Sequence, residues 1–282
     1  IRQEPQANDS TSRGVYMKLL VFVKQIPDPD IPPARLSIDP QSNTVVPSAG
    51  SIPVLSLLDE LAVEAALRLK DEHGGEVTVV SLCNDPVMNV VKKPLAMGAD
   101  ELILLQDQAF EGGDAFSTAQ ALVAAATKVG DYDLILCGTQ AGDWDNGQVG
   151  PYIAEALDIP CITAVGHLEI VDGKIRGERT VGDVTATVEA SLPALVTTGN
   201  GVGKARYPKL GDIMAAGRKK PQIWDARELG IDTSRVGVAG ALTKVRLLYV
   251  EERVGECEII EGETPAAAGE KLALRLRELR II

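Results

Sequence analysis

The chain has 282 residues, of which 45% are hydrophobic and 24% charged, the balance of an ordinary globular protein with one large or two modest domains. Its formal net charge of −12 argues against nucleic acid or anionic membranes as main partners, and no apolar run approaches the roughly 20 residues of a transmembrane helix. Four cysteines without a CxxC pair and two histidines predict reduced thiols, a cytoplasmic location and no bound metal.

The first sixteen residues are polar and lack the apolar centre of a signal peptide. Arg13-Gly14 can be encoded by AGG-GGN, which resembles a bacterial ribosome-binding site shortly upstream of the Met17 codon. We therefore expect residues 1–16 to be a leader or disordered extension, and Met17 to be the native start.

From Met17 onward, short apolar runs alternate four times with helical patterns. The expected strands are 18–24, 76–82, 101–106 and 133–138, and the expected helices are 57–72, 85–99, 116–130 and 151–159. This alternation predicts right-handed crossovers and an α/β fold with a mainly parallel sheet.

After residue 160 the pattern changes to shorter strands, with Asp172-Gly173 as the expected hairpin turn. Residues 225–268 are poorly patterned for an independent core, and 270–279 form a last amphipathic helix. We expect a nucleotide-binding domain over residues 17–222 and an extended C-terminal arm over 223–282.

The sequence GTQAGDWDNGQVGP, the 138–151 loop, lies between a strand and a helix. Residues 147–150 would leave free backbone N–H groups at the helix N-terminus, which attracts phosphate. Asp143 and Asp145 favour a nucleotide, because carboxylates accept hydrogen bonds from ribose hydroxyls or an adenine amino group; they could instead hold the loop through Asx turns. A plain glycine-rich turn is the alternative.

Two other phosphate-binding signatures are missing. VKQIPDPD stands after the first strand, where a dinucleotide fold would carry GxGxxG. GNGVGKA, residues 199–205, has one residue too few between its outer glycines for a Walker loop, and Ala205 replaces the required Ser or Thr. The chain is therefore expected to be neither a P-loop NTPase nor a standard dinucleotide dehydrogenase.

Six segments carry a family resemblance. VFVKQIPD, DELAVEAALRLKD, LAMGADELILL, DLILCGTQAGDWDNGQVGPYIAEAL, LPALVTT and RYPKLGDIMAAGRKKP occur in this order between Met17 and about residue 222. Together they resemble the beta subunit of electron-transfer flavoproteins. The resemblance implies a nucleotide-binding α/β sandwich without GxGxxG, and an alpha subunit that carries the redox FAD and is wrapped by the C-terminal arm.

The resemblance also implies the positions of the nucleotide contacts. In this family the phosphate of the adenosine lies on the loop that matches Gly138 to Val149, and other contacts come from the first two strands and the start of the first helix. The implied cofactor-binding residues are Phe22, Val23, Ser56, Asp59, Leu82, Cys83, Gly138, Gln140, Ala141, Asp143, Asp145, Asn146, Gly147, Gln148 and Val149.

The nucleotide is AMP in ordinary members and a second FAD in electron-bifurcating members. GQVGP and VKQIPD are more similar to members that carry flavin in the beta subunit, so we expect FAD and keep AMP as the alternative. Trp144 could stack on adenine or flavin, or pack at a surface or interface.

Residues 206–214, RYPKLGDIM, are called the docking segment below. Leu210 matches the exposed leucine that inserts into an acyl-CoA dehydrogenase in this family, and Arg206, Tyr207 and Ile213 flank it. The alternative is a buried loop leucine.

The expected function is that of an electron carrier between acyl-CoA or other dehydrogenases and a quinone oxidoreductase or similar acceptor. No residue of this chain is expected to be catalytic. One alternative is a subunit of an electron-bifurcating complex that oxidises NADH. A second is a nucleotide-sensing module without redox function.

Overall fold

A computed structural model describes residues 16–32, 35–39, 43–46, 50–250 and 257–282. The expected leader lies outside these ranges except for Tyr16. By its internal contacts the chain divides into two units, of which the first ends at Leu247 and the second begins at Leu248. Each unit is described by itself.

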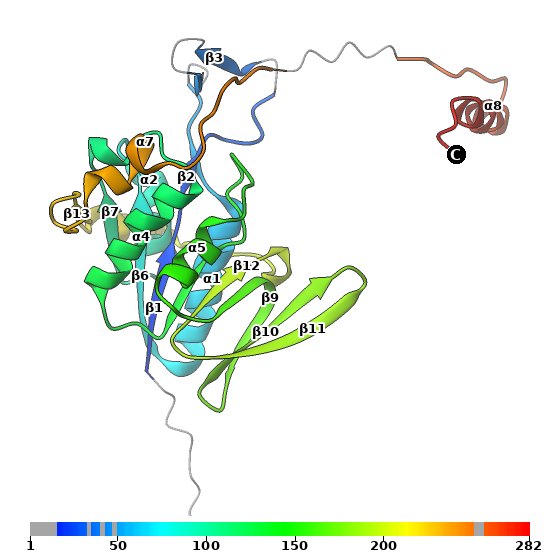
Figure 1. Ribbon diagram of the computed structural model, residues 1–282. Helices are drawn as coiled ribbons and strands as arrows, with labels where there is room; N and C mark the ends of the chain where they lie inside the picture. The colour runs from blue at the N-terminus through cyan, green and yellow to red at the C-terminus, as the bar shows by residue number, and fades with distance from the viewer. Residues whose placement is uncertain (1–15, 33–34, 40–42, 47–49, 251–256) are drawn as a thin grey trace, which may run out of the picture. The chain divides into compact units, whose positions relative to one another are not determined.

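A nine-stranded sheet runs through the first unit (Figure 1). Its strands are β1 (Met17–Phe22), β6 (Gly75–Leu82), β7 (Glu101–Leu105), β8 (Leu134–Gly138), β9 (Cys161–Val171), β10 (Lys174–Val181), β11 (Val184–Ser191), β12 (Ala194–Thr198) and β13 (Gln222–Trp224). Their order is β11-β10-β9-β12-β8-β1-β6-β7-β13, and the pairs from β9 to β13 are parallel whereas β9, β10 and β11 are antiparallel. The mainly parallel α/β fold is confirmed.

Helices flank this sheet, and two small ribbons lie between β1 and the first helix. The helices are α1 (Leu57–His73), α2 (Met88–Val91), α3 (Lys93–Met97), α4 (Ala115–Val129), α5 (Val149–Ala156), α6 (Leu210–Arg218) and α7 (Gly237–Gly240). The ribbons pair β2 (Gln25–Ile26) with β5 (Val54–Leu55), and β3 (Ser37–Asp39) with β4 (Thr44–Val46).

The central strands are buried on both faces, which explains why their sequences are continuous apolar runs. Along β1, Leu19 and Val21 pack into one core cluster, with residues of α1, α3 and α6. Leu20 and Phe22 pack into the other, with residues of α4 and α5. The alternation of side chains along a strand therefore places helices on both sides of the sheet.

The strand order reverses direction at β1. Strands β6 and β7 extend the sheet from one side of β1, and β8 lies on its other side. In an open parallel sheet, the crossovers diverge at such a point and leave a crevice at the carboxyl ends of the two strands. The fold therefore directs attention to the segments that follow Phe22 and Gly138.

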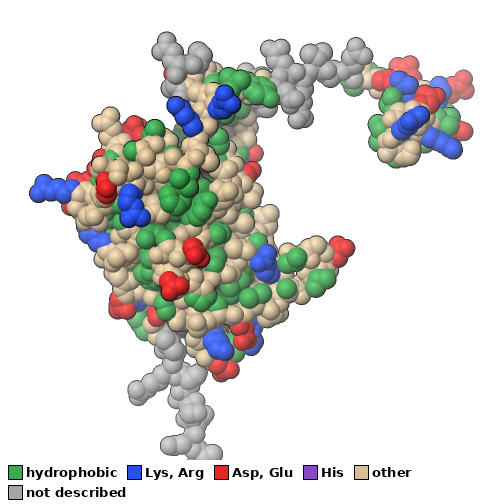
Figure 2. Space-filling model, viewed as in Figure 1, with side chains coloured by type: hydrophobic (Ala, Val, Ile, Leu, Met, Phe, Trp, Pro, Cys, Tyr) green, Lys and Arg blue, Asp and Glu red, His purple; other side chains and the backbone are tan. Residues whose placement is uncertain are grey.

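Local turn chemistry agrees with the sequence at the hairpin between β9 and β10. Asp172 and Gly173 have φ angles of 51° and 74°, which confirms a turn that needs left-handed residues. The next hairpin, β10–β11, projects from the sheet with Val181 and Val184 exposed, and Figure 2 shows hydrophobic side chains along it.

The helix expected over residues 85–99 is instead two short helices, α2 and α3. Pro94 lies in the first turn of α3, where its missing N–H costs nothing, and it cannot continue a helix from α2. The prediction of a single helix was wrong. It followed the helical periodicity of the apolar residues and gave too little weight to Pro94.

Residues 225–247, for which the sequence indicates no independent core, pack on the rest of the first unit. Ala226 and Val236 are buried in the same core cluster as α4 and α5. Strand β13, just before them, extends the sheet beside β7. The first unit therefore continues past residue 222 to Leu247.

The second unit contains α8 (Pro265–Glu278), which confirms the predicted terminal helix. Thr264 caps it by accepting a hydrogen bond from Ala267 N, and Arg275 pairs with Glu258 and Glu278. No residue of α8 is buried, and Leu272 and Leu274 are exposed. Within the described ranges, no helix has the length and apolar character that crossing a membrane requires.

Asp114 joins α4 to the last part of the first unit. Its Oδ1 accepts a hydrogen bond from Ser117 N at 2.9 Å and so caps α4. Its Oδ2 accepts from Leu242 N and Thr243 N, both at 2.8 Å, and from Thr243 Oγ1 at 3.0 Å. One carboxylate therefore fixes the chain shortly before the second unit begins.

We predict that Asp114→Ala lowers the free energy of unfolding by about 1–2 kcal/mol, the usual cost of a lost helix cap. It should also speed hydrogen exchange at the amides of Leu242 and Thr243, because both lose their acceptor. Asp232→Ala is the control, since Asp232 caps a short 3-10 turn through Ser234 N without binding the 242–243 segment. Unchanged exchange at these two amides in Asp114→Ala would contradict the anchoring role.

Candidate functional site

The first turn of α1 joins the ends of β1 and β8. Asp59 Oδ1 accepts a hydrogen bond from Gly138 N at 2.8 Å, and Asp59 Oδ2 accepts from Lys24 N at 2.9 Å. A Cβ on residue 138 would lie 2.6 Å from Asp59 Oδ1, so the close approach of the end of β8 to the first turn of α1 requires glycine there. Asp59 thereby fixes both edges of the crevice at which the strand order reverses.

Asp59 is 6% exposed, and its electrostatics follow from that burial. Burial raises the pKa of Asp59 to about 7, while the N–H groups of Gly138 and Lys24 and the charge of Lys24 act in the opposite direction. With both oxygens turned to backbone donors, Asp59 organises the strand ends. A direct contact between Asp59 and a nucleotide stays a prediction.

The carboxylates of the 138–151 loop hold the loop in place. Lys24 Nζ donates a hydrogen bond to Asp143 Oδ2 at 2.6 Å, and Gln140 Nε2 donates to Asp145 Oδ1 at 3.1 Å. Thr139 N donates to Thr198 O at 2.9 Å, which ties the start of the loop to β12. Of the roles expected for Asp143 and Asp145, these contacts support the holding of the loop.

The second half of the loop presents unpaired backbone donors. Gly147 has a φ of 63°, a left-handed conformation that side chains rarely adopt, and Gln148 is the N-cap of α5. Within the described ranges, no residue accepts a hydrogen bond from the N–H groups of residues 146–150. Unpaired amides at a helix N-terminus attract anions, so this arrangement fits a phosphate group.

The other loop residues expected in the site lie on the same stretch. Asn146 and Gln148 are exposed, Ala141 is half-buried, and Val149 packs partly against the core on the α4 side. Trp144 is half exposed, and no contact with another ring is found for it within the described residues. The structure therefore brings the whole predicted loop to one edge of the sheet.

The strand residues expected in the site are brought to the same edge, but their side chains point into the core. Phe22 and Val23 are buried in the two opposite clusters, and Leu82 packs partly against the α4 side. Cys83 N donates to Leu105 O at 3.1 Å, and burial raises the pKa of the Cys83 thiol. Any contact from Phe22 or Val23 to a ligand would therefore use backbone atoms.

Ser56 is the N-cap of α1 and is fully buried. Its N–H donates to Lys24 O at 2.9 Å. Its hydroxyl interacts with the Asp59 carboxylate, which counteracts part of the rise that burial causes in the pKa of Asp59. A direct contact between Ser56 and a nucleotide stays a prediction.

Two residues of the site were not singled out in the sequence. Lys24 supplies the ion pair to Asp143 and a backbone donor to Asp59, and it stands within the segment VFVKQIPD that carries the resemblance. Thr198 Oγ1 donates to Leu58 O at 3.0 Å and so links β12 to α1. A threonine at the end of an apolar strand carries no signal of this kind, because the contact depends on tertiary packing.

The docking segment forms an exposed apolar surface. Tyr207 is 95% exposed and Leu210, the first residue of α6, is 74% exposed, while Ile213 and Met214 are also exposed. This exposure excludes the alternative of a buried loop leucine at position 210. Arg206, expected beside them as a docking residue, pairs with Glu64 and Asp71, and its docking role stays a prediction.

The sequence of the chain matches known proteins over most of its length. Residues 53–229 match the model of the electron transfer flavoprotein domain. The chain is 37% identical over 267 residues to the electron transfer flavoprotein subunit beta of Thermoanaerobacterium thermosaccharolyticum, an alignment that covers 94% of this chain and 100% of that relative.

Two further relatives have different names. Subunit CarD of the caffeyl-CoA reductase-Etf complex of Acetobacterium woodii is 35% identical, over 94% of this chain and 100% of its own length. Protein FixA of Azotobacter vinelandii is 36% identical, over 87% of this chain and 89% of its own length.

The pKa of Asp59 predicts a pH dependence of stability. Because the folded-state pKa of about 7 lies above that of an unfolded aspartate, the folded protein holds an extra proton between about pH 4 and 7, and its stability falls as pH rises through this window. From pH 5 to 7, the wild type should lose roughly 2 kcal/mol more of its free energy of unfolding than Asp59→Asn.

Urea denaturation at the two pH values measures this difference. Asp30→Asn, at an exposed position, controls for the general effect of removing an acidic side chain. Equal losses in the wild type and Asp59→Asn would show that Asp59 does not titrate in this window.

Proposed function

This chain belongs to the electron transfer flavoprotein beta-subunit family, and we propose that it binds a nucleotide on the 138–151 loop and presents the docking segment to dehydrogenases. As a beta subunit it works in electron transfer together with an alpha subunit. The proposed complex accepts electrons from dehydrogenases, acyl-CoA dehydrogenases among them, and passes them to a quinone oxidoreductase or a similar acceptor.

The unpaired amides of residues 146–150 carry this proposal. They lie at the carboxyl edge of the sheet, where the strand order reverses and nucleotides bind in folds of this kind. In the proposed arrangement these amides hold the phosphate, and the Ser56 hydroxyl and the backbone after β1 and β6 face the adenosine. Lys24, paired with Asp143 at the same edge, keeps the loop in the shape that presents these amides.

We propose FAD as this nucleotide, with AMP as the alternative. An FAD at this site would supply reversible uptake and release of electrons, whereas AMP would stabilise the fold without redox chemistry. What the chain itself does is the same in both cases: Asp59 orders the two strand ends, the loop amides bind phosphate and the core side chains exclude water beneath them.

A second candidate is a subunit of an electron-bifurcating complex that oxidises NADH. Two observations favour it: the GQVGP loop is similar to that of flavin-carrying beta subunits, and one relative is named as part of a caffeyl-CoA reductase-Etf complex. An absorbance spectrum of the purified complex of this chain with its alpha subunit distinguishes the candidates. Two flavins support bifurcation, one flavin with AMP supports the carrier, and no flavin supports a nucleotide-sensing module.

We propose that the second unit binds the alpha subunit. Its helix α8 has leucines on its surface and no buried residue, so its apolar face needs a partner. The resemblance to beta subunits, whose C-terminal arm wraps the alpha subunit, supports that choice of partner.

We predict that Gly147→Val empties the nucleotide site of this chain and loosens the complex with the alpha subunit. A β-branched residue disfavours a φ of 63°, so the loop would change shape and its amides would lose their common direction. A ligand that binds the folded form also stabilises it, and that stabilisation would be lost. The measurement is the nucleotide released on heat denaturation, identified by chromatography as AMP or FAD.

Gly182→Val is the matched control, because Gly182 has a similar φ of 61° in the β10–β11 turn, away from the loop. Asp145→Asn should be milder than Gly147→Val, since an amide oxygen can still accept the hydrogen bond from Gln140. Full nucleotide content in Gly147→Val would mean that this loop is not the phosphate site.

We predict that Leu210→Ala slows electron transfer from an acyl-CoA dehydrogenase and leaves the nucleotide content unchanged. Truncating an anchor side chain at a small interface typically costs about 1–3 kcal/mol. Stopped-flow mixing of the reduced dehydrogenase with the complex measures the rate. Ile223→Ala, an exposed apolar residue of β13, is the control, and a wild-type rate in Leu210→Ala would exclude docking through this residue.

A further inference from the structure

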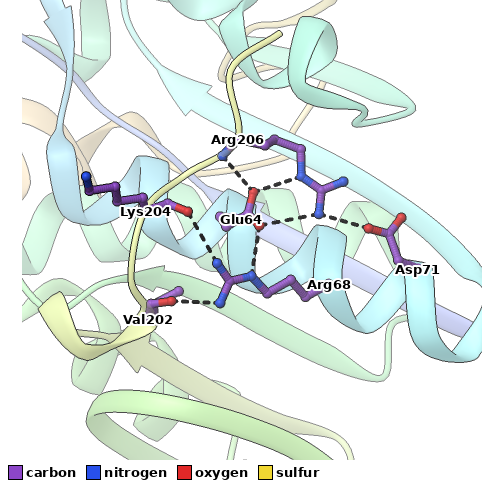
Figure 3. A network of polar contacts seen from close by, with 6 residues as sticks. All are labelled: Glu64, Arg68, Asp71, Val202, Lys204 and Arg206. Carbon is purple, nitrogen blue, oxygen red and sulfur yellow. Dashed lines mark hydrogen bonds and ion pairs between the residues drawn. The ribbon is translucent and has the colours of Figure 1, made fainter.

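A buried glutamate connects α1 to the chain that precedes the docking segment (Figure 3). Glu64 is 4% exposed. Its Oε2 accepts hydrogen bonds from Arg206 N at 3.0 Å and Arg206 Nε at 2.8 Å, and its Oε1 accepts from Arg68 Nε at 2.8 Å. The carboxylate therefore binds both the backbone and the side chain of Arg206.

The same network reaches the residues before Arg206. Arg68, one turn after Glu64 on α1, donates from Nη1 to Val202 O at 2.7 Å and from Nη2 to Lys204 O at 3.3 Å. Arg206 Nη2 also donates to Asp71 Oδ2 at 2.9 Å, at the exposed rim of the network. Three side chains of α1 thus hold residues 202–206 against the helix.

Residues 203–209 form neither helix nor strand. Within the described ranges, the backbone N–H groups of Lys204, Ala205 and Tyr207 donate to no other residue. Backbone pairing therefore does little to fix this stretch, and its path depends on Glu64 and Arg68, with some packing of Ala205 against the core.

The docking segment is held at its other end by α6. Ala216 is buried against α3, and Lys92 Nζ donates to Gly217 O at 3.0 Å. The exposed side chains of Tyr207, Leu210 and Ile213 lie between this anchor and the Glu64 network. Two fixed ends determine the direction in which the apolar residues between them project.

The energetics of Glu64 agree with a tightly held network. Burial alone would raise the pKa of Glu64, but the hydrogen bonds from Arg206 and Arg68 outweigh it and lower that pKa. A buried pair of this kind is weak support for stability, because apolar residues of similar size often serve a fold equally well. A paired charge at this position is better explained by the geometry that it imposes.

We propose that Glu64 is a positioning residue for partner docking: through Arg206 and Arg68 it sets the path of residues 202–206 and the direction of the docking segment. This inference rests on the proposed docking function. It also changes the role expected for Arg206, which orients the segment from within the domain through its hydrogen bonds to Glu64.

The test uses the complete complex with the alpha subunit and compares Glu64→Gln with the wild type. The variant should speed hydrogen exchange over residues 203–209. If the docking-competent orientation falls to about a tenth of the population, the apparent KM for an acyl-CoA dehydrogenase rises about tenfold. The kcat and the nucleotide content should stay unchanged, which a merely destabilised fold would not produce.

Glu60→Gln is the matched control, because Glu60 lies on the same helix and pairs with Lys93, outside the network that holds the docking segment. Arg206→Gln and the double variant complete a cycle. If Glu64 acts through Arg206, the double variant should be no worse than the worse single variant. Should Glu64→Gln fail to fold, Arg206→Gln alone carries the test, since Arg206 is partly exposed.

The outcomes separate this inference from the docking function itself. If Leu210→Ala raises the KM while Glu64→Gln changes neither exchange nor KM, the positioning role of Glu64 is wrong. If Glu64→Gln speeds exchange over 203–209 but neither variant changes the KM, the network holds the segment and docking lies elsewhere, which overturns the proposal for docking. An unchanged KM in Arg206→Gln would contradict the positioning role of Glu64, which acts on the docking segment through Arg206.

Discussion

The pairing of one buried carboxylate with two backbone amides sets the geometry of the sheet's carboxyl edge. Asp59 binds Lys24 N, just after β1, and Gly138 N, at the end of β8, so the two strands between which the topology reverses meet at one side chain. Backbone donors of this kind need an acceptor once they are buried, and a free carboxylate would be costly there without them. The carboxylate of Asp59 and the two backbone amides therefore stabilise one another in their buried position. The start of the 138–151 loop is fixed as a result.

Helix α1 supports both regions to which function is assigned. Asp59 and Glu64 are five residues apart, which places them roughly 140° apart around the helix and about 7.5 Å along it. One faces the strand ends, and the other faces the chain before the docking segment. A single rigid helix can keep two sites at a fixed distance and orientation without a direct contact between them. The apolar residues of α1 lie in the core, which fixes the position of the helix.

Periodicity and turn residues predicted most of the fold, because they report local physics: apolar runs became buried parallel strands, and Asp172-Gly173 formed its turn. The resemblance directed attention to the 138–151 loop, and the structure adds how it is held, through Lys24 and Thr198. Contacts between distant segments left no such pattern. In the sequence, Glu64 has the pattern of an ordinary glutamate on a helix surface, and only the fold places Arg206, far along the chain, beside it. The burial of Ala226 and Val236 cannot be predicted from the residues next to them in the sequence.

Asp114 anchors Leu242 and Thr243 within the first unit, so the chain is fixed shortly before the second unit begins. A tethered chain samples a limited volume, so it meets a partner already held by the first unit at an effective concentration in the millimolar range, on the order expected for short tethers. Contacts that would be too weak between separate molecules then suffice to close around that partner. If the second unit binds the alpha subunit as proposed, the assembly would be stable even where each contact made by the described residues 257–282 is weak.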